Sequence, residues 1–406
     1  MKPHRSRIGR FTAAVVLGAL LPLVAAAAEP LKIGVIDDMG GPYSSVSGPG
    51  SVFAARMAIQ DFGGEVLGRK IELLTADDQN KPDIGLGTAR RWYDQDGVSM
   101  ITGLANSSIA LGVQKLAMDR KKINIVVSAA SGELTAKSCS PTGFHWMYNT
   151  VAFARGTVEG LSTQPGQKWF FITPDYAFGQ TMQADATRFI EAKGGRVIGS
   201  VKQPLGTTDY SSYMLQAAAS GADVVALASA GTDLENALKA AREFGLATSG
   251  KKIAVFFIQT GSILALGLPV IQDTLAPTTF FPSMNDGAMK WSQRFMAEGP
   301  TKKPPTNAQA GVYSAVMHYL KAVRAAATDD GPKVAEQIRR MPIDDVTGHG
   351  FLVRKDGQVL RDVYVTRIKK PSESKSPLDL VQSVTTIPGA VAFQSLPEGG
   401  CEWANR

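Results

Sequence analysis

The stretch VSMITGLANSSIALGVQKLAMDRKKINIVVSAA, residues 98–130, contains the pattern that decides the fold. An apolar run (98–104) leads through a small polar turn into an amphipathic helical pattern (108–121), and a second apolar run (123–130) follows. Two apolar strands joined by a helix form the βαβ unit of a parallel sheet that is covered on both faces. The helix opens on Ser107 and Ser108, which raises the question whether these serines react with a ligand or only hold it.

The same alternation extends in both directions and predicts an α/β protein. Strands are expected at 31–38, 70–78, 98–104, 123–130, 168–175, 196–204, 223–230 and 252–260, and helices at 50–63, 84–97, 108–121, 181–195, 210–221 and 234–246. The segment 144–161 separates the strands into two runs, so the sequence predicts two doubly wound lobes, as its length also suggests.

The rest of the chain shows no third alternation of this kind. Helical patterns at 307–327 and 332–341 have no strand from which to start another sheet, so we expect them to cover a lobe that is already built. Apolar segments at 350–357 and 360–368 are joined by Asp356-Gly357, a pair typical of tight turns, and predict a β-hairpin.

The N-terminus predicts export. Lys2, Arg5, Arg7 and Arg10 precede an apolar run, Phe11–Ala28, that ends in small residues, which is the pattern of a signal peptide over residues 1–28. A membrane anchor is the alternative, but Pro22 and the closing alanines argue against it. The net charge of +7 includes those four leader cations, and the remaining +3 does not predict a nucleic-acid partner.

The two cysteines, Cys139 and Cys401, can form a disulfide in an exported protein. We predict such a bond, which would hold the C-terminal tail near the middle of the fold. Two separate buried thiols are the alternative, because sequence does not show whether the Cα atoms come close enough.

No constellation for catalysis is present. The nucleophile elbow, the phosphate-binding loop, the dinucleotide fingerprint and the His-Glu-x-x-His zinc motif are all absent. His145, His318 and His349 lack partners at ligand or triad spacing and are interpreted as structural, while Asp37-Asp38 and Asp77-Asp78 are interpreted as turn or helix caps. We expect no enzyme activity, no metal and no cofactor.

In open α/β sheets, ligands bind beyond the carboxyl ends of the strands. The turns at these ends are rich in glycine, tyrosine and small hydroxyl residues: DDMGGPYSS (37–45), GLANSS (103–108), SAASGELT (128–135), TPDYAFG (173–179), ASAGTDLE (228–235) and FIQTGS (257–262). A ligand site made by several of these turns is the expectation.

The order and spacing of six stretches resemble the periplasmic solute-binding proteins of ABC importers, in the branch named for leucine, isoleucine and valine binding. These stretches are LKIGVIDDMGGPYS (31–44), GRKIELLTADDQNKPD (68–83), ITGLANSSIALGVQKLA (101–117), VVSAASGELT (126–135), PDYAFGQ (174–180) and ALKAAREFGL (237–246). The resemblance implies a type I periplasmic binding protein fold, a periplasmic location, a monomer, a small-molecule ligand and a membrane permease as partner.

The resemblance also implies how the lobes are divided. Lobe one would comprise 29–147 and 279–347, lobe two 148–278 and 348–370, and the tail 371–406 would return to the hinge. The three hinge crossings would lie near Trp146–Val151, Leu275–Phe281 and Val346–Gly350. The lobes of such proteins close on a ligand that contacts both.

In the family, two lobe-one turns bind the ligand carboxylate. The matching residues are Asn106, Ser107 and Ser108 in one turn and Ala129, Ala130 and Ser131 in the next. Hydroxyls and free N–H groups at a helix N-terminus suit an anion. The alternative is that Ser107 only caps its helix.

Lobe two departs from the amino-acid binders, which place an acidic residue against the ligand ammonium. The matching turn reads Gln259-Thr260-Gly261. A buried ammonium without a charged partner is costly, so this turn argues against an amino-acid ligand. Asp175 or Asp233 could substitute from neighbouring turns, which keeps that alternative open.

Aromatic residues are frequent in or beside the same turns and suit a flat ligand. They are Tyr43, Trp146, Tyr148, Tyr176 and Phe178, although Trp146 and Phe178 could equally be packing residues. HWMYNT with DYAFG resembles the subgroup of the family that carries aromatic carboxylates such as benzoate and phenylpropenoate derivatives. The predicted ligand-binding residues are Tyr43, Asn106, Ser107, Ser108, Ala129, Ala130, Ser131, Tyr148, Tyr176, Phe178, Ala230, Gly231, Gln259 and Thr260.

Three other functions remain open at this point. The same fold could bind a branched-chain or other amino acid, or it could sense a ligand for a signalling partner. A periplasmic hydrolase using Ser107 or Ser108 with His145 is the alternative from another class.

Overall fold

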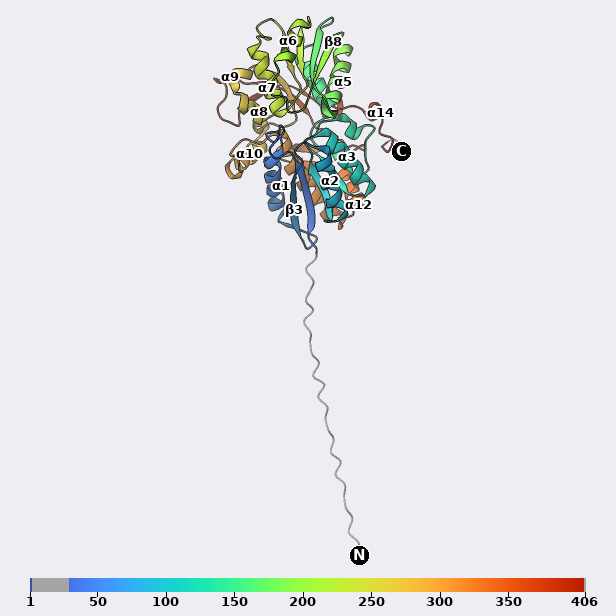
Figure 1. Ribbon diagram of the computed structural model, residues 1–406. Helices are drawn as coiled ribbons and strands as arrows, with labels where there is room; N and C mark the ends of the chain where they lie inside the picture. The colour runs from blue at the N-terminus through green and yellow to red at the C-terminus, as the bar shows by residue number, and fades with distance from the viewer. Residues whose placement is uncertain (2–28, 405–406) are drawn as a thin grey trace.

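The computed structural model describes residues 1 and 29–404, so the predicted signal peptide, apart from Met1, lies outside the described residues. Figure 1 shows two lobes, one with α1, α2, α3 and β3 and the other with α5 to α9 and β8, while α14 and the C-terminus lie beside their junction. Within residues 29–404, no helix is long and apolar enough to cross a membrane.

Lobe one is built on a six-stranded sheet with strand order β2-β3-β1-β4-β5-β6. The strands are β1 (Leu31–Asp37), β2 (Glu65–Val66), β3 (Arg69–Asp77), β4 (Val98–Gly103), β5 (Ile123–Val126) and β6 (Gly143–His145), and the helices between them are α1 (Gly48–Phe62), α2 (Pro82–Asp94) and α3 (Ser107–Asp119). All pairs except β2–β3 are parallel. Every residue of β4 and β5 is buried, as expected for a sheet covered on both faces.

Lobe two has a four-stranded parallel sheet with strand order β10-β9-β7-β8. The strands are β7 (Lys168–Pro174), β8 (Arg196–Gln203), β9 (Val224–Leu227) and β10 (Lys252–Val255), and the helices are α4 (Thr150–Gly160), α5 (Ala177–Ala192), α6 (Ser211–Ala219), α7 (Gly231–Glu243), α8 (Thr260–Leu266) and α9 (Leu268–Ile271). The predicted α/β fold class of two doubly wound lobes is confirmed.

The late helices are α10 (Asp286–Glu298), α11 (Asn307–Ala326) and α12 (Gly331–Arg340). Helices α11 and α12 are the two that the sequence predicts to cover a lobe already built, whereas α10 was not predicted. Helix α11 packs along α1 and α12 and contacts β4, and most of its residues are buried. It begins with a capping box, in which Thr306 accepts a hydrogen bond from the N–H of Gln309 and the Gln309 side chain accepts from the N–H of Thr306.

The predicted hairpin at 350–368 is confirmed only beside its turn. Gly357 donates its N–H to the carbonyl of Arg354 (2.9 Å), and Arg354 and Leu360 donate to the carbonyls of Gln358 (2.8 Å) and Leu352 (3.2 Å) around the Val353–Val359 bridge. β13 (Gly348–Phe351) pairs with β12 (Ile343–Asp345), whereas β14 (Val363–Ile368) lies between β11 (Leu275–Thr278) and β15 (Val381–Ile387). The two expected hairpin strands therefore belong to different sheets.

The same residues move the third crossing later than the predicted Val346–Gly350. Gln358 bridges to His145 at the end of β6, and Val359 donates its N–H to the His145 carbonyl (3.0 Å). The buried guanidinium of Arg361 then donates to the Trp146 carbonyl (2.9 Å) in the first crossing. The chain leaves the lobe-one sheet only after these contacts.

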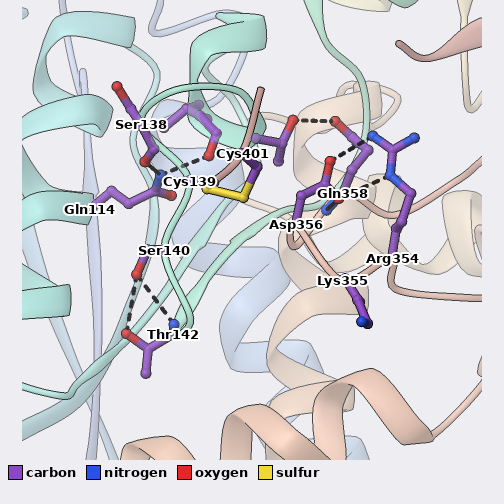
Figure 2. The surroundings of a disulfide bond; sticks show 12 residues. Gln114, Ser138, Cys139, Ser140, Thr142, Arg354, Lys355, Asp356, Gln358 and Cys401 are labelled. Atoms are coloured by element: carbon purple, nitrogen blue, oxygen red, sulfur yellow. Dashed lines mark hydrogen bonds and ion pairs between the residues drawn. A yellow bond between two sulfur atoms is a disulfide. The ribbon is translucent and has the colours of Figure 1, made fainter. Parts of the chain in front are cut away.

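The C-terminal tail runs across the hinge and ends on lobe one. Its short helices are α13 (Gly389–Ala392), which contacts α4, and α14 (Leu396–Gly399), which contacts the 3-10 turn η1 (Gly132–Thr135). Cys401 forms a disulfide with Cys139, with the Cα atoms 5.7 Å apart (Figure 2). The structure therefore contains the bond that the two cysteines predict.

Candidate ligand-binding cleft

A cleft lies between the carboxyl ends of the two parallel sheets, beside the places where strand order reverses. Its empty volume is about 270 Å³. Lobe one contributes Tyr43, Val46, Ala105, Ser128 and Ala130, and lobe two contributes Tyr176, Phe178, Ala230 and Phe257. That figure includes space open to solvent, and the enclosed part is about 20 Å³, room for about one water molecule, so the lobes lie closed on each other here.

The lobes are in contact across this cleft. The hydroxyls of Tyr43 and Tyr176 hydrogen-bond to each other, and Thr232 at the start of α7 donates its N–H to the Pro42 carbonyl (3.1 Å). Gly231 comes so close to the same carbonyl that a Cβ would lie 2.2 Å from it. The cleft is thus closed by backbone contacts and by a pair of tyrosines.

Asp38 positions Tyr43 in the loop after β1. Its carboxylate accepts the N–H groups of Gly41 (2.6 Å) and Tyr43 (2.8 Å) and the side-chain amide of Asn80 (2.5 Å). This is the turn-capping role that the sequence predicts for the aspartate pair. Asp37 is fully buried, and this burial raises its pKa.

The aromatic lining has a second layer behind it. Phe257 meets Phe178 edge to face, with ring centroids 6.0 Å apart. Tyr148 packs edge to face on Phe257 (5.1 Å) and donates its hydroxyl to the Ser128 carbonyl (2.9 Å), so it supports the cleft from behind. Trp146 is a packing residue, since its indole N–H donates to Ser314 inside lobe one.

The cleft contains hydroxyls that have no protein partner within the described residues. The Oγ atom of Ser128 is buried and unpaired, and so are those of Ser45 and Ser131 in the neighbouring turns. Buried polar groups are almost always hydrogen-bonded, and of these three serines Ser128 is the one that lines the cleft.

The residues of the serine-rich turn are bonded within lobe one, and their predicted contact with a ligand stays a prediction. Asn106 caps α3 by accepting from the N–H groups of Ser108 (2.9 Å) and Ile109 (3.3 Å), and its amide donates to Asn80. Ser107 is fully buried and accepts the Ser131 N–H (3.3 Å). The cap is Asn106 rather than Ser107, and Asn106, Ser107 and Ser108 are not among the residues that line the cleft.

His145 cannot act as a base for these serines in this arrangement. It is fully buried, and its Nε2 contacts the Ala129 carbonyl (2.8 Å). Burial lowers its pKa to about 4. His318 likewise contacts a carbonyl, that of Ile338, and His349 is exposed. The structural interpretation of the histidines therefore agrees with their surroundings.

The Gln259-Thr260 turn and the two aspartates considered as partners for a ligand ammonium lie in three different environments. Gln259 accepts the Asn307 N–H (3.0 Å) and, like Thr260, lines a separate cavity beside the second crossing. Asp175 is half exposed and pairs with Lys202 (2.8 Å). Asp233 is buried, accepts the Gly206 N–H, and has a pKa raised to about 6 by burial.

Charge is therefore absent from the cleft surface itself. No carboxylate, amine, guanidinium or imidazole is among its lining residues. In residues 29–404, no group of three or more His, Cys, Asp or Glu side chains is arranged to hold a metal ion.

The structure brings together Tyr43, Ala130, Tyr176, Phe178 and Ala230 from the predicted set. Val46, Ala105, Ser128 and Phe257 also line the cleft but were not predicted. Each of these four lies in or next to a strand-end turn, which is the signal that could have found them. Ala129, Ser131, Tyr148 and Gly231 are neighbours of the lining, and Gln259 and Thr260 face the other cavity.

Two α/β lobes that close on a small interlobe cleft define a binding protein. The family model described as "Periplasmic binding protein" matches residues 30–375. A periplasmic binding protein from Burkholderia mallei is 41% identical, covers 92% of this chain and 99% of its own, and has a TM-score of 0.89. The chain belongs to the periplasmic binding protein family, whose members bind small molecules in the periplasm for ABC permeases.

Two further solved structures have the same fold. A branched-chain amino acid ABC transporter ligand-binding protein from Burkholderia xenovorans is 36% identical, covers 92% of this chain and 100% of its own, and has a TM-score of 0.80. A solute-binding protein from R. palustris in complex with 4-hydroxybenzoate is 20% identical, covers 88% and 97%, and has a TM-score of 0.78.

The Tyr43–Tyr176 pair should slow ligand release. Tyr43→Phe and Tyr176→Phe each remove the same hydrogen bond, so each is expected to raise the dissociation rate by about fivefold. The double variant should be no faster than either single variant, because the partners share one interaction. Stopped-flow release measures this, with Tyr213→Phe as control, and additive effects would contradict a shared bond.

Proposed function

We propose that this protein is the receptor of an ABC importer and captures a small aromatic carboxylate, such as a benzoate or phenylpropenoate derivative, by hinge closure. The observation that carries the proposal is the unpaired buried hydroxyl of Ser128 in the lining of an aromatic, uncharged cleft, with further unpaired hydroxyls at Ser45 and Ser131 in the adjoining turns. Hydroxyls can hold a carboxylate without a cation when water is excluded.

The aromatic lining supports a flat ring as the other half of the ligand. Tyr43, Tyr176, Phe178 and Phe257 surround the space that a ring would fill. A ligand held by lobe-one hydroxyls and lobe-two rings would contact both lobes, and only such a ligand favours closure.

An amino-acid ligand is the second candidate, and Asp233 favours it. This carboxylate is buried, and its charge acts on the cleft residues Tyr43 and Tyr176. It does not line the cleft, however, and Gly206 already occupies both of its oxygens. We therefore prefer a ligand without an ammonium group.

A thermal-shift screen tests the ligand class. Benzoate, 4-hydroxybenzoate and cinnamate are expected to raise the melting temperature, and leucine and valine are not, because a ligand that binds only the folded state stabilises it by roughly 2.7 kcal/mol at 100 times its Kd. Ser128→Ala should lower the affinity for the acid by about tenfold, and Ser212→Ala, at an exposed position, should leave the affinity unchanged. Shifts with leucine and valine alone would overturn the aromatic assignment.

We further propose that the protein performs no catalysis. His145 is the base that a hydrolase with Ser107 or Ser108 would need, but it is fully buried, its Nε2 contacts the Ala129 carbonyl, and no hydrogen bond joins it to either serine. Incubation with aryl esters should give no turnover above that of a Ser108→Ala variant. Turnover that this substitution abolishes would support a hydrolase instead.

A further inference from the structure

A chain of hydrogen bonds runs behind the cleft from lobe one to lobe two. Gly132, one residue beyond the turn Ala129–Ser131, donates its N–H to the Thr150 hydroxyl (3.1 Å). That hydroxyl donates to the carboxylate of Asp185 (2.6 Å), and the Thr150 N–H donates to the Ala130 carbonyl (2.7 Å). Thr150 is thus fixed by both lobes at once.

The two ends of this chain belong to the two halves of the cleft. Ala130 lines the cleft from lobe one. Asp185 is on α5, whose first turn carries Phe178 and which Tyr176 precedes. The carboxylate therefore connects the helix that presents the rings with the turn that presents the hydroxyls.

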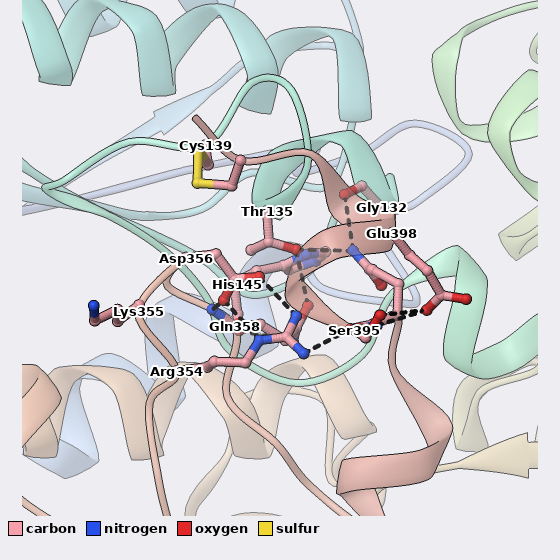
Figure 3. A network of polar contacts seen from close by, with 12 residues as sticks. Gly132, Thr135, Cys139, His145, Arg354, Lys355, Asp356, Gln358, Ser395 and Glu398 are labelled. Atoms are coloured by element: carbon pink, nitrogen blue, oxygen red, sulfur yellow. Dashed lines mark hydrogen bonds and ion pairs between the residues drawn. A yellow bond between two sulfur atoms is a disulfide. The ribbon is translucent and has the colours of Figure 1, made fainter. Parts of the chain in front are cut away.

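The surroundings of the chain hold it in place. Thr150 is fully buried at the first position of α4, where Asn149 caps the helix. The side chain of Gln394 from the tail donates to the Gly132 carbonyl (3.4 Å; Figure 3). Because the Gly132 N–H bonds to Thr150, Gly132 is held on both its N–H and its C=O sides. Arg188 lies between Asp185 (3.9 Å) and Glu398 (3.6 Å) and joins the tail to the same chain.

We propose that Asp185 and Thr150 are positioning residues for ligand binding, which hold the lobe-one turn in register with α5. Neither side chain lines the cleft, so they act through Gly132 and Ala130. The proposal deepens the proposed receptor function and rests on it. A Thr150 hydroxyl that donates to a carboxylate keeps its lone pairs for the Gly132 N–H, whereas a hydroxyl without that acceptor is free to rotate away.

Substitutions at Thr150 test the chain with matched controls. Thr150→Val keeps the shape and removes the hydroxyl, and it should weaken benzoate binding by about tenfold and speed hydrogen exchange at Gly132. Thr150→Ser should restore both to within about twofold. Thr181→Val is the control. Thr181 lines a surface crevice together with Gly132 and Asp185, but its hydroxyl bonds within α5.

Asp185→Asn and Asp185→Ala extend the test to the far end of the chain. The asparagine oxygen can still accept from Thr150, so its loss of affinity should be smaller than the roughly tenfold loss expected for alanine. A melting temperature that falls equally in Thr150→Val and Thr150→Ser, with unchanged benzoate affinity in both, would show a merely structural role and overturn the proposal.

The exchange measurement separates this proposal from the proposed function. If benzoate and the other acids do not bind the unmodified protein, the ligand class is wrong, and the chain is then judged by exchange at Gly132 in the unliganded protein. Faster exchange in Thr150→Val but not in Thr150→Ser supports the chain, and equal exchange in all variants overturns it.

Discussion

Replacing Gly231 by alanine is expected to weaken ligand binding by about 100-fold, because overpacking of this size costs roughly 2–3 kcal/mol. In the closed protein a Cβ at Gly231 would lie 2.2 Å from the Pro42 carbonyl and 3.0 Å from the Tyr43 ring. Both neighbours belong to lobe one, so the clash exists only when the lobes are closed. The open protein accommodates the methyl group, and the ligand loses the state that it binds.

The control for this variant is Gly221→Ala in the same lobe. Gly231 and Gly221 have φ angles of +57° and +71°, so alanine strains both positions, but a Cβ at Gly221 meets nothing within 4 Å. Calorimetry with the acid selected by thermal shift measures affinity, and fluorescent labels at the exposed positions Arg90 and Lys239 report closure. Equal affinities in the two alanine variants would contradict the steric argument.

The α/β architecture is predictable from the sequence because its signals are local. The runs that became β4 and β5 are apolar on both faces, and only a sheet covered on both sides buries such runs. Gly63 and Gly97, which have positive φ angles just beyond α1 and α2, mark helix ends that the chain itself encodes.

The pairing of strands that lie far apart in the chain is harder to predict from the sequence. The Asp356-Gly357 turn is correct as a turn, but the residues after it bridge to His145 and then to β11 and β15, far away in the chain. β15 follows a polar segment and carries mostly exposed residues, so its sequence VQSVTTI offers no strong apolar pattern. Local turn chemistry therefore does not decide which strands pair.

The candidate site is predictable to the level of the turn and not of the side chain. The carboxyl-end rule selects the turns that form the cleft, yet within one turn Ser128 and Ala130 line it while Ala129 does not. Which residue faces the ligand depends on backbone angles that a short polar turn leaves open. In the serine-rich turn, the Asn106 side chain is engaged as the cap of α3, and Ala105 is the residue that lines the cleft.

Removing the disulfide is expected to lower the free energy of unfolding by about 3–5 kcal/mol, because it closes a very long loop. Cys139 and Cys401 are separated by 262 positions, and both belong to the described fold. A Cys139→Ser/Cys401→Ser double variant should melt roughly 5–10 °C below the unmodified protein, and reductant should shift only the unmodified protein. Identical melting temperatures in calorimetry would contradict this prediction.

The contacts of the tail suggest where this stability is lost first. Trp403 lies near the guanidinium of Arg339 (4.6 Å), and Gln394 bonds to Asn149 (2.8 Å) in the first crossing, while β15 remains paired with β14. Without the disulfide, residues beyond β15 keep these contacts and the buried side chains of Ala392 and Phe393 but lose their cross-link to lobe one, so they should be the first to open. Limited proteolysis should then cut the double-serine variant between Ile387 and Cys401 before any site in the lobes. The cleft residues are not in this segment, so the ligand affinity of the double-serine variant should fall far less than that of Gly231→Ala. The two variants therefore distinguish the stability of the tail and hinge from the closure of the cleft.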